Sequence, residues 1–245
     1  RLYRRAKELG CEYVVTGHYA RIEEENGRFL LKKAVDPTKD QSYVLYSMTQ
    51  DELRHTLFPL GGMTKMHTRE LARKLGFYNA DKPDSQDICF VPDGDYASFI
   101  RSFTGRDYPR GEFVDKSGNV LGEHRGLIGY TVGQRKGLGI ALGEPKYVTA
   151  LMPKENRVVL GSNEDLMSRE LDAKNFNFIA FDTPPAEFRA SARVRYRQAE
   201  QPATVRVTGE NTVHITFDEP QRAITKGQAV VVYDGDVVIG GGEIC

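Results

Sequence analysis

The spacing of apolar residues near the start of the chain predicts a helix followed by a strand. Three apolar positions share one helical face, and Gly10 follows them as a C-terminal cap: Leu2, Ala6 and Leu9. A helix already in progress at the first residue indicates that further sequence precedes it. The apolar run at 12–16 predicts a buried parallel strand that opens at Gly17 and His18. Open α/β sheets gather their active sites at such strand ends.

Turn and cap residues divide the next part of the chain. Asn26-Gly27 lies between two strand-like segments and suits a type I′ hairpin turn. Thr49 and Glu52 have the spacing of a capping box, which predicts a short helix. Two further helical stretches follow: 64–76, capped by Thr64 and ended by Gly76, and 95–103.

From about residue 106 onward the segments become short, rich in β-formers and punctuated by glycine. In the run 212–217, Val213, Ile215 and Phe217 alternate with polar residues, and Asp234-Gly235 marks a hairpin. The C-terminal part is therefore predicted to be a small antiparallel barrel or sandwich. We expect three domains: an α/β part at 1–105, a β-rich middle at 106–165 and a β-barrel at 166–245.

Composition narrows the class of protein. Lysine and arginine together number 34, as do aspartate and glutamate, so nucleic-acid binding would depend on local basic surfaces. No apolar run is long enough to span a membrane, and no signal-like segment opens the chain. Three cysteines are few and odd in number, which does not fit a secreted scaffold held by disulfides. The cysteine content therefore favours a cytoplasmic location.

The segment 188–198 carries the densest positive charge. Strand alternation places Phe188, Ala190, Ala192, Val194 and Tyr196 on one face of this segment. It places the following residues on the other face: Arg189, Ser191, Arg193, Arg195 and Arg197. Guanidinium groups can grip phosphates with paired hydrogen bonds. The pattern fits an RNA-binding stripe and a solvated face paired with carboxylates equally well.

A second basic feature is the segment 130–143, in which four glycines bracket Arg135 and Lys136. Glycines allow backbone amides to approach a ligand closely. The pattern does not fit the Walker A phosphate loop. Taken alone, it favours a glycine-rich hairpin with exposed charges.

The cysteines and histidines leave several interpretations open. Cys89 lies between Ile88 and Phe90 in an acidic, turn-rich stretch, and both a packed and a reactive thiol fit this setting. Cys11 is expected to pack beside the predicted strand, whereas Cys245 has no motif around it. No metal-ligand spacing is present, so no resident metal site is predicted.

Six blocks together resemble the family of tRNA-specific 2-thiouridylases, in the family's order and over nearly the whole chain. The blocks are TGHYAR (16–21), DPTKDQSYVLY (36–46), PLGGMTK (59–65), DSQDICF (84–90), IGYTVGQRKGLGI (128–140) and RVRYRQ (193–198). The resemblance implies part of a PP-loop domain (adenine nucleotide α-hydrolase-like, with a parallel sheet), a small central β domain and a C-terminal β-barrel.

The resemblance also implies a transferase activity on the wobble uridine of tRNA. ATP, with Mg²⁺, would adenylate the C2 oxygen, and a cysteine persulfide would then supply sulfur. The implied partners are the tRNA anticodon loop and a sulfur donor such as a cysteine desulfurase or a sulfur-relay protein. An anticodon loop offers unstacked bases, so a wobble base can be turned into a pocket at modest cost.

Residue by residue, the resemblance assigns Cys89 as the persulfide-bearing cysteine and Gly17 as part of the ATP site. It assigns the following residues to tRNA contacts: His18, Lys39, Asp40, Gln41, Arg195, Tyr196 and Gln228, with Arg135 and Lys136 at the tRNA backbone.

The chain departs from the family pattern in one respect. The family's Ser-Gly-Gly-x-Asp-Ser phosphate loop and its second catalytic cysteine, which would form a disulfide with Cys89, are absent from the 245 residues. We therefore expect a chain truncated at its N-terminus that binds ATP poorly and is inactive alone. Two alternatives stay open: a tRNA-binding module without chemistry, and another PP-loop ATPase acting on a different carbonyl.

Overall fold

The computed structural model describes residues 2–82, 91 and 94–245. Its contacts form two compact units. The barrel unit comprises Arg1–Lys82, Arg169–Pro220 and Thr225–Cys245, and the central unit comprises Pro83–Ser168 and Gln221–Ile224. The first eighty or so residues thus share a unit with the C-terminal strands, while the predicted division into three domains stays a prediction.

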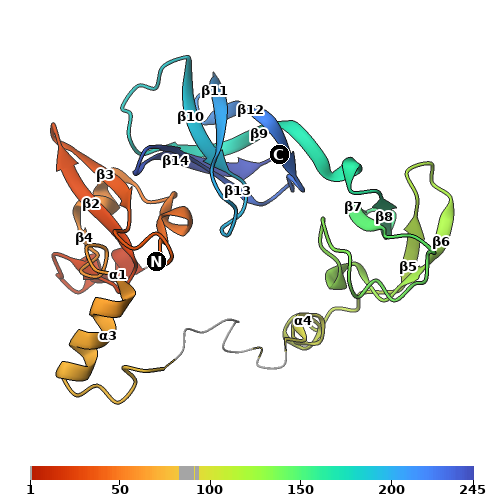
Figure 1. Ribbon diagram of the computed structural model, residues 1–245, viewed down its shortest axis with the longest axis horizontal. Helices are drawn as coiled ribbons and strands as arrows, with labels where there is room; N and C mark the ends of the chain where they lie inside the picture. Colours follow the sequence, from red (N-terminus) through yellow and green to blue (C-terminus); the bar gives the residue numbers. More distant parts are fainter. Residues whose placement is uncertain (1, 83–90, 92–93) are drawn as a thin grey trace. The chain divides into compact units, whose positions relative to one another are not determined.

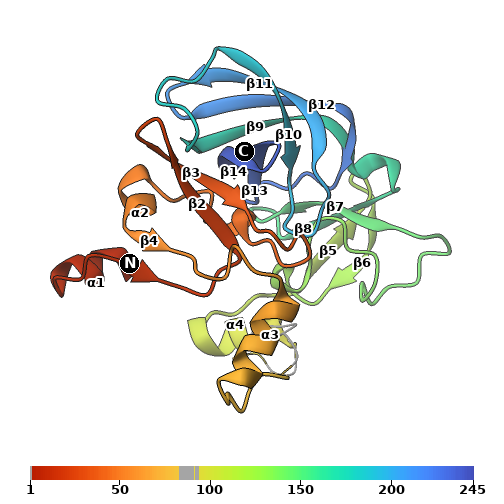
Figure 2. The ribbon, with the colours of Figure 1, turned by 60° about the vertical axis from the view of Figure 1, so that its left-hand side comes forward.

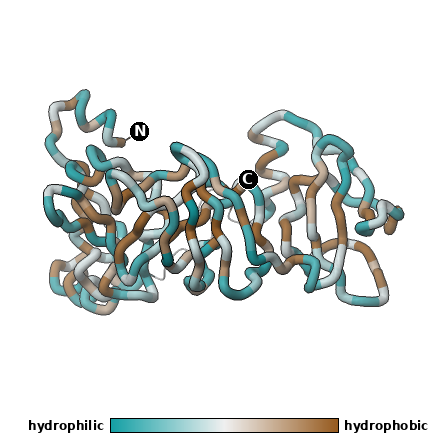
Figure 3. The backbone as a smooth tube through the Cα atoms, turned by 90° about the horizontal axis from the view of Figure 1, so that it is seen from above, coloured by the Kyte–Doolittle hydropathy of each residue, from teal (hydrophilic) through white to brown (hydrophobic). Residues whose placement is uncertain are grey.

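Six strands of the barrel unit close into a barrel (Figure 1). In order they are β13 (Ala229–Asp234), β10 (Glu187–Arg193), β11 (Gln201–Gly209), β12 (Thr212–Arg222), β9 (Met167–Phe178) and β14 (Val237–Ile244), with β13 also paired to β14. Val213, Ile215 and Phe217 of β12 face the core and are at most 1% exposed. Figure 3 shows hydrophobic and hydrophilic stretches alternating along the chain. The predicted barrel is confirmed, as is the hairpin at Asp234-Gly235.

A hairpin of β2 (Ala20–Glu25) and β3 (Arg28–Lys33) extends the sheet of the barrel. β3 pairs with β14 through Lys32 and Val237, so the hairpin lies beside the barrel strands (Figure 2). Its turn residues Asn26 and Gly27 have φ values of 53° and 78°. Both values are positive, as a type I′ turn requires, so this prediction is confirmed.

The caps predicted for two helices are confirmed. Thr49 and Glu52 form a capping box at the start of α2 (Gln50–Arg54). Thr64 accepts a hydrogen bond from the His67 amide at the start of α3 (Lys65–Lys74). Side-chain caps satisfy amides that a helix leaves unpaired in its first turn, so these short polar residues determine where both helices begin.

The strand predicted at 12–16 is parallel, but its predicted burial is wrong. β1 (Val14–Val15) pairs in parallel with β4 (Thr56–Leu57). Val15 is 59% exposed and Leu57 is 46% exposed, and Cys11, which was expected to pack, is exposed as well. Leu2, the first residue of α1 (Leu2–Glu8), and Leu9, which follows the helix, are also exposed. Within the described residues β1 has β4 as its only strand partner. The burial prediction was wrong because an apolar run indicates a preference for burial but does not provide the layer that would cover it.

The central unit contains a four-stranded sheet over its own core. The strand order is β6 (Val120–His124), β5 (Gly111–Val114), β8 (Arg157–Gly161) and β7 (Tyr147–Met152). Phe113, Val148 and Val158 are fully buried in this core. α4 (Tyr96–Thr104) confirms the helical stretch predicted at 95–103, and the Asp95 side chain caps its start. None of the described helices has the length and apolarity that crossing a membrane requires.

Candidate nucleic-acid interface

The loop at 36–41, predicted to contact tRNA, begins at an aspartate that is fixed to a helix. Asp36 Oδ2 accepts a hydrogen bond of 2.9 Å from the backbone amide of Lys65, the first residue of α3. Its other oxygen accepts from the amide and hydroxyl of Thr38. These hydrogen bonds, above all the one from the Lys65 amide, hold the pKa of Asp36 below its usual range. The carboxylate is therefore ionised at neutral pH and anchors the start of the loop.

Asp40 anchors the other end of the loop. Its side chain is only 7% exposed. Oδ1 accepts hydrogen bonds from the amides of Ala34 and Ser42, and Oδ2 accepts from the Ser42 hydroxyl at 2.8 Å and from Arg193 Nη2 at 3.1 Å. The carboxylate predicted to contact tRNA is thus turned into the protein, where it holds the loop in place.

The partner of Asp40 is a buried arginine at the end of β10. The Arg193 side chain is 11% exposed, and its guanidinium lies 5.2 Å from the ring centre of Tyr43 and 4.9 Å from that of Tyr233. Nε and Nη2 donate to the Tyr233 hydroxyl at 3.0 and 2.6 Å. Burial raises the pKa of Tyr233, so this hydroxyl stays neutral and can accept these bonds. Burial acts to lower the pKa of Arg193, but Tyr233 and Asp40 outweigh it and leave the pKa raised.

The predicted arginine stripe along 188–198 is wrong, because β10 ends at Arg193. Beyond it the chain turns, with the Gln198 amide donating to the Arg195 carbonyl and the Val194 amide donating to the Gln198 side chain. Arg189 pairs with Asp218 on the barrel surface at 2.6 Å, as the carboxylate-paired alternative anticipated.

This turn nevertheless brings two predicted RNA contacts beside the 36–41 loop. The Tyr196 hydroxyl donates to the Asp40 carbonyl at 3.2 Å, and the Tyr196 ring lies 6.0 Å from that of Tyr43. Tyr196 is 43% exposed, although alternation had placed it on the face opposite the arginines, with Ala192 and Val194. Arg195 Nη2 donates to the Thr225 hydroxyl at 3.1 Å. An exposed aromatic ring next to a cation is a surface on which RNA bases can stack.

Gln228 lies on the neighbouring loop between β12 and β13. Its backbone amide donates to the backbone carbonyl of Thr225, the residue that Arg195 contacts, and its backbone carbonyl accepts from the Ile244 amide. The Gln228 residue is exposed. The loops that carry Gln228, Arg195 and Tyr196 are therefore linked by direct hydrogen bonds.

The strand end at Gly17 and His18 joins the same surface through Gln41. The Tyr19 amide donates to Gln41 Oε1 at 2.9 Å, and the Gln41 amide donates to the Tyr19 carbonyl at 2.8 Å. His18 Nδ1 lies 2.8 Å from the Thr16 hydroxyl. Tyr19 therefore connects His18 to the loop, and hydrogen bonds link most of the predicted contact residues of the barrel unit.

Gly17 fits a nucleotide site only in part. A Cβ atom at Gly17 would meet the Leu60 side chain at 3.6 Å, an ordinary contact, so packing does not require glycine there. An open strand end of this kind suits the approach of a nucleotide. In the described parts of the chain, however, no cluster of three or more acidic, histidine or cysteine side chains could hold a metal ion. The family's phosphate-loop pattern does not occur in the 245 residues either.

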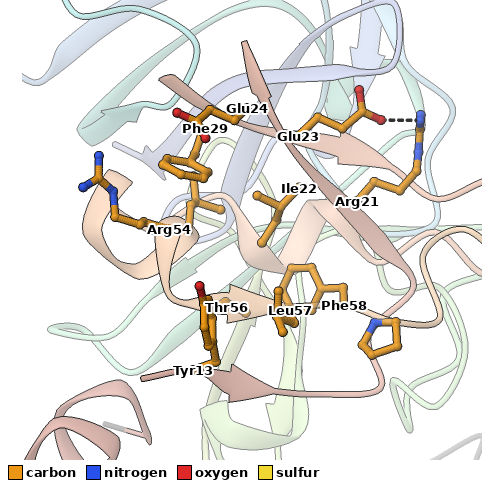
Figure 4. A pocket seen from close by; sticks show the side chains of 12 residues that line it. Tyr13, Arg21, Ile22, Glu23, Glu24, Phe29, Arg54, Thr56, Leu57 and Phe58 are labelled. Carbon is orange, nitrogen blue, oxygen red and sulfur yellow. Dashed lines mark hydrogen bonds and ion pairs between the residues drawn. The ribbon is translucent and has the colours of Figure 1, made fainter. Parts of the chain in front are cut away.

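A groove of about 860 Å³ opens over the hairpin and β4 (Figure 4). Its lining combines the apolar side chains of Tyr13, Ile22, Phe29 and Leu57 with ion-paired residues such as Arg21. It contains none of the residues predicted to bind ATP or tRNA. The groove is therefore lined mainly by the β2–β3 hairpin and by residues 53–59, apart from the predicted site residues.

The basic segment of the central unit is an irregular loop, so the predicted hairpin at 130–143 is wrong. Gly133, Gly137, Gly139 and Gly143 all have positive φ, which interrupts strand pairing. The loop is fixed to β7 by backbone hydrogen bonds between Gly133, Gln134 and Val148. Arg135 and Lys136 lie within it, and Lys136 is exposed, as a phosphate contact must be.

Cys89, the predicted persulfide cysteine, lies outside the described residues. Cys11 and Cys245 are exposed free thiols.

Sequence reasoning missed the anchoring role of Arg193, which it had placed on a solvent-facing stripe. Asp40 lies 153 residues earlier in the chain, so no local pattern connects the two. The one available signal was that 36–41 and 193–198 both belong to blocks shared with the same family.

Three family profiles match the chain. They are described as tRNA methyl transferase HUP domain (residues 1–93), tRNA methyl transferase PRC-barrel domain (97–162) and aminomethyltransferase beta-barrel domain (168–244). Together with the parallel β1–β4 pair and the closed barrel, they confirm the predicted fold class.

Curated relatives match over almost the whole chain. The tRNA-specific 2-thiouridylase MnmA of Clostridioides difficile is 52% identical over 244 residues, which cover 99% of this chain and 68% of the relative. The enzyme of the same name from Carboxydothermus hydrogenoformans is 51% identical, covering 99% and 67%. That of Acetivibrio thermocellus is 50% identical, covering 98% and 67%.

Proposed function

The chain belongs to the family of tRNA-specific 2-thiouridylases, and we propose that it serves in ATP-dependent 2-thiolation of the wobble uridine of tRNA. In this proposal Cys89 carries the sulfur and the barrel unit holds the anticodon loop. The observation that carries the proposal is the DSQDICF block around Cys89, within a chain about half identical to 2-thiouridylases along 99% of its length.

The chemistry requires two steps at the uridine. When bound, ATP would supply an AMP group to the C2 oxygen with release of pyrophosphate, which would turn a poor leaving group into a good one. The terminal sulfur of a deprotonated Cys89 persulfide then attacks C2 and expels AMP. A second thiol attacks the Cys89 sulfur, which breaks the S–S bond, leaves sulfur on C2 and forms a disulfide with Cys89. A thiol reductant then restores both cysteines.

The residues of the barrel unit support the RNA-binding half of the proposal. Lys39 and Gln41 lie on an anchored loop, Tyr196 presents an exposed ring beside that loop, and Arg195 and Gln228 adjoin it. His18 lies at the strand end that Tyr19 links to Gln41. In the central unit, Arg135 and Lys136 would contact the tRNA backbone. Cationic and aromatic side chains held by buried anchors suit a looped, partly unstacked RNA.

The proposal assigns nucleotide activation mainly to the part of the family pattern that these 245 residues lack. Gly17 would border the ATP, whereas the phosphate loop, the Mg²⁺ site and the second cysteine would come from that part. A cysteine desulfurase or a sulfur-relay protein would load Cys89.

The test replaces Cys89 in the gene of the organism that makes this protein. In a Cys89→Ser strain, tRNA digested to nucleosides should lack 2-thiouridine by mass spectrometry, whereas a matched Cys11→Ser strain should retain it. The purified Cys89→Ser chain should still bind tRNA. Normal 2-thiouridine in the Cys89→Ser strain would refute the assignment.

The same experiment addresses the alternative of a tRNA-binding module without chemistry. That alternative predicts unchanged 2-thiouridine in both strains, together with tRNA binding by the chain that falls steeply with salt.

A further inference from the structure

The ion pair between Arg193 and Asp40 is unlike the Arg189–Asp218 pair on the same strand. The side chains of Arg193 and Asp40 are 11% and 7% exposed, whereas those of Arg189 and Asp218 are 59% and 47% exposed. A buried ion pair is an inefficient means of stabilising a fold, because desolvation offsets most of the attraction. Removing one partner is costly, however, since the other charge remains buried without compensation. Such a pair therefore defines a geometry more than it adds stability.

The geometry defined here joins two segments that the proposed function assigns to tRNA. Asp40 lies between Lys39 and Gln41, and Arg193 lies shortly before Arg195 and Tyr196 in the turn that follows β10. The Tyr196 hydroxyl donates to the backbone carbonyl of Asp40, so the two segments meet at the same residue. If either segment moved, the RNA-binding side chains of the two would no longer be aligned with each other.

The surroundings of Arg193 leave little of its side chain open to RNA, since only 11% of it is exposed. Two tyrosine rings flank the guanidinium, and its Nε and Nη2 atoms donate to the Tyr233 hydroxyl and to Asp40. A lysine could not reproduce this arrangement, because its ammonium group is neither planar nor able to donate from two nitrogens.

We infer that Arg193 is a positioning residue, whose buried guanidinium fixes the 36–41 loop to the barrel in the arrangement that binds tRNA. This inference rests on the proposed function. Without Arg193 the Asp40 carboxylate is left buried without its cation, so it moves toward water and carries Lys39 and Gln41 with it. The fraction of protein with a binding-competent loop falls, and the apparent dissociation constant rises by the same factor.

The test measures binding of a synthetic anticodon stem-loop RNA to the 245-residue chain at several salt concentrations. Arg193→Met should raise the apparent dissociation constant roughly tenfold, which corresponds to about a tenth of the molecules keeping the binding-competent loop. The slope of log affinity against log salt should stay that of the wild type, because the side chains that neutralise phosphates are unchanged. Arg195→Met, which removes a proposed phosphate-binding cation, should reduce that slope by about 0.7 to 0.9.

A matched control separates positioning from general stability. Arg28 has a side chain only 16% exposed, is paired with Asp182 and donates to the Ile179 carbonyl, but makes none of these bonds to the 36–41 loop. Arg28→Met should lower the melting temperature and leave RNA affinity unchanged. Hydrogen exchange at residues 39–42 should accelerate in Arg193→Met and not in Arg28→Met.

A second variant tests the cause and covers the case in which Arg193→Met fails to fold. An asparagine at position 40 keeps an oxygen for the Ala34 and Ser42 amides and removes the buried charge. The double variant Arg193→Met with Asp40→Asn should therefore recover part of the lost affinity, whereas Arg193→Lys should not.

Three outcomes would overturn the inference. They are wild-type affinity in Arg193→Met, a reduced salt slope in that variant, and an equal loss of affinity in Arg28→Met. If the wild-type chain itself bound this RNA without salt dependence while loop exchange still rose in Arg193→Met, the proposed function would fail. The ion pair would then hold a loop that has no role in RNA binding.

Discussion

Two adjacent glycines, Gly61 and Gly62, give a sharp test of the packing beside Gly17. Gly61 is buried, and a Cβ atom there would overlap the Ala20 carbonyl group, lying 2.5 Å from its carbon. Gly62 is exposed, and a Cβ atom there would meet nothing within 4 Å. Neither residue has a positive φ, so alanine is compatible with both backbones.

The two substitutions should change the free energy of unfolding in opposite directions. At Gly61 the obstacle is backbone, which cannot rotate away, and overpacking of this kind costs about 1–3 kcal/mol. Moving the loop also weakens the 3.0 Å hydrogen bond from the Val35 amide to the Gly61 carbonyl, which adds roughly 0.5–1.5 kcal/mol. Gly62→Ala should instead stabilise by about 0.4–1 kcal/mol, because it restricts the unfolded chain.

Urea unfolding followed by circular dichroism measures the difference. With a urea dependence of about 1–3 kcal/mol per molar, the midpoints of the two variants should differ by roughly 1 M or more. Gly61→Ala should be the less stable variant and Gly62→Ala at least as stable as the wild type. Equal midpoints for the two variants would refute the close approach of Gly61 to Ala20.

Three further predictions concern other parts of the chain. The Lys65 amide lowers the pKa of Asp36, so the ionised carboxylate stabilises the fold above the ordinary pKa of about 3.9. This stability is lost as the pH falls through the lowered pKa, so the melting-temperature difference between wild type and Asp36→Asn should vanish in acid. Phe217→Ala, at a core position 1% exposed, should cost about 3–5 kcal/mol in urea unfolding. Replacing Arg135 and Lys136 by glutamine should reduce the salt slope of tRNA binding by about 0.7–0.9 for each phosphate that is no longer neutralised, whereas Lys154→Gln should leave it unchanged.

Features that depend on neighbours in the sequence could be predicted. The alternation in β12, the turn at Asn26-Gly27 and the Thr49 capping box each depend on residues a few positions apart, and all three are present in the structure. Local chemistry determines such features because a strand face, a turn or a cap is formed within one segment.

Features that depend on distant partners could not be predicted. Alternation continues through Arg195 and Arg197, yet the backbone turns after Arg193, and nothing in RVRYRQ indicates this. Arg193 was expected to face solvent, but the Asp40 carboxylate that holds it inside lies in a loop far along the chain. The apolarity of Val15 indicated burial without specifying what would cover it.

The central claim, that Cys89 carries the sulfur, is tested most directly by loading the chain with sulfur. The 245-residue protein is incubated with a cysteine desulfurase and cysteine, alkylated, digested and examined by mass spectrometry for an added sulfur atom at each of its three cysteines. We predict added sulfur on Cys89 and none on Cys11 or Cys245. Sulfur on Cys11 or Cys245, with Cys89 unmodified, would contradict the account.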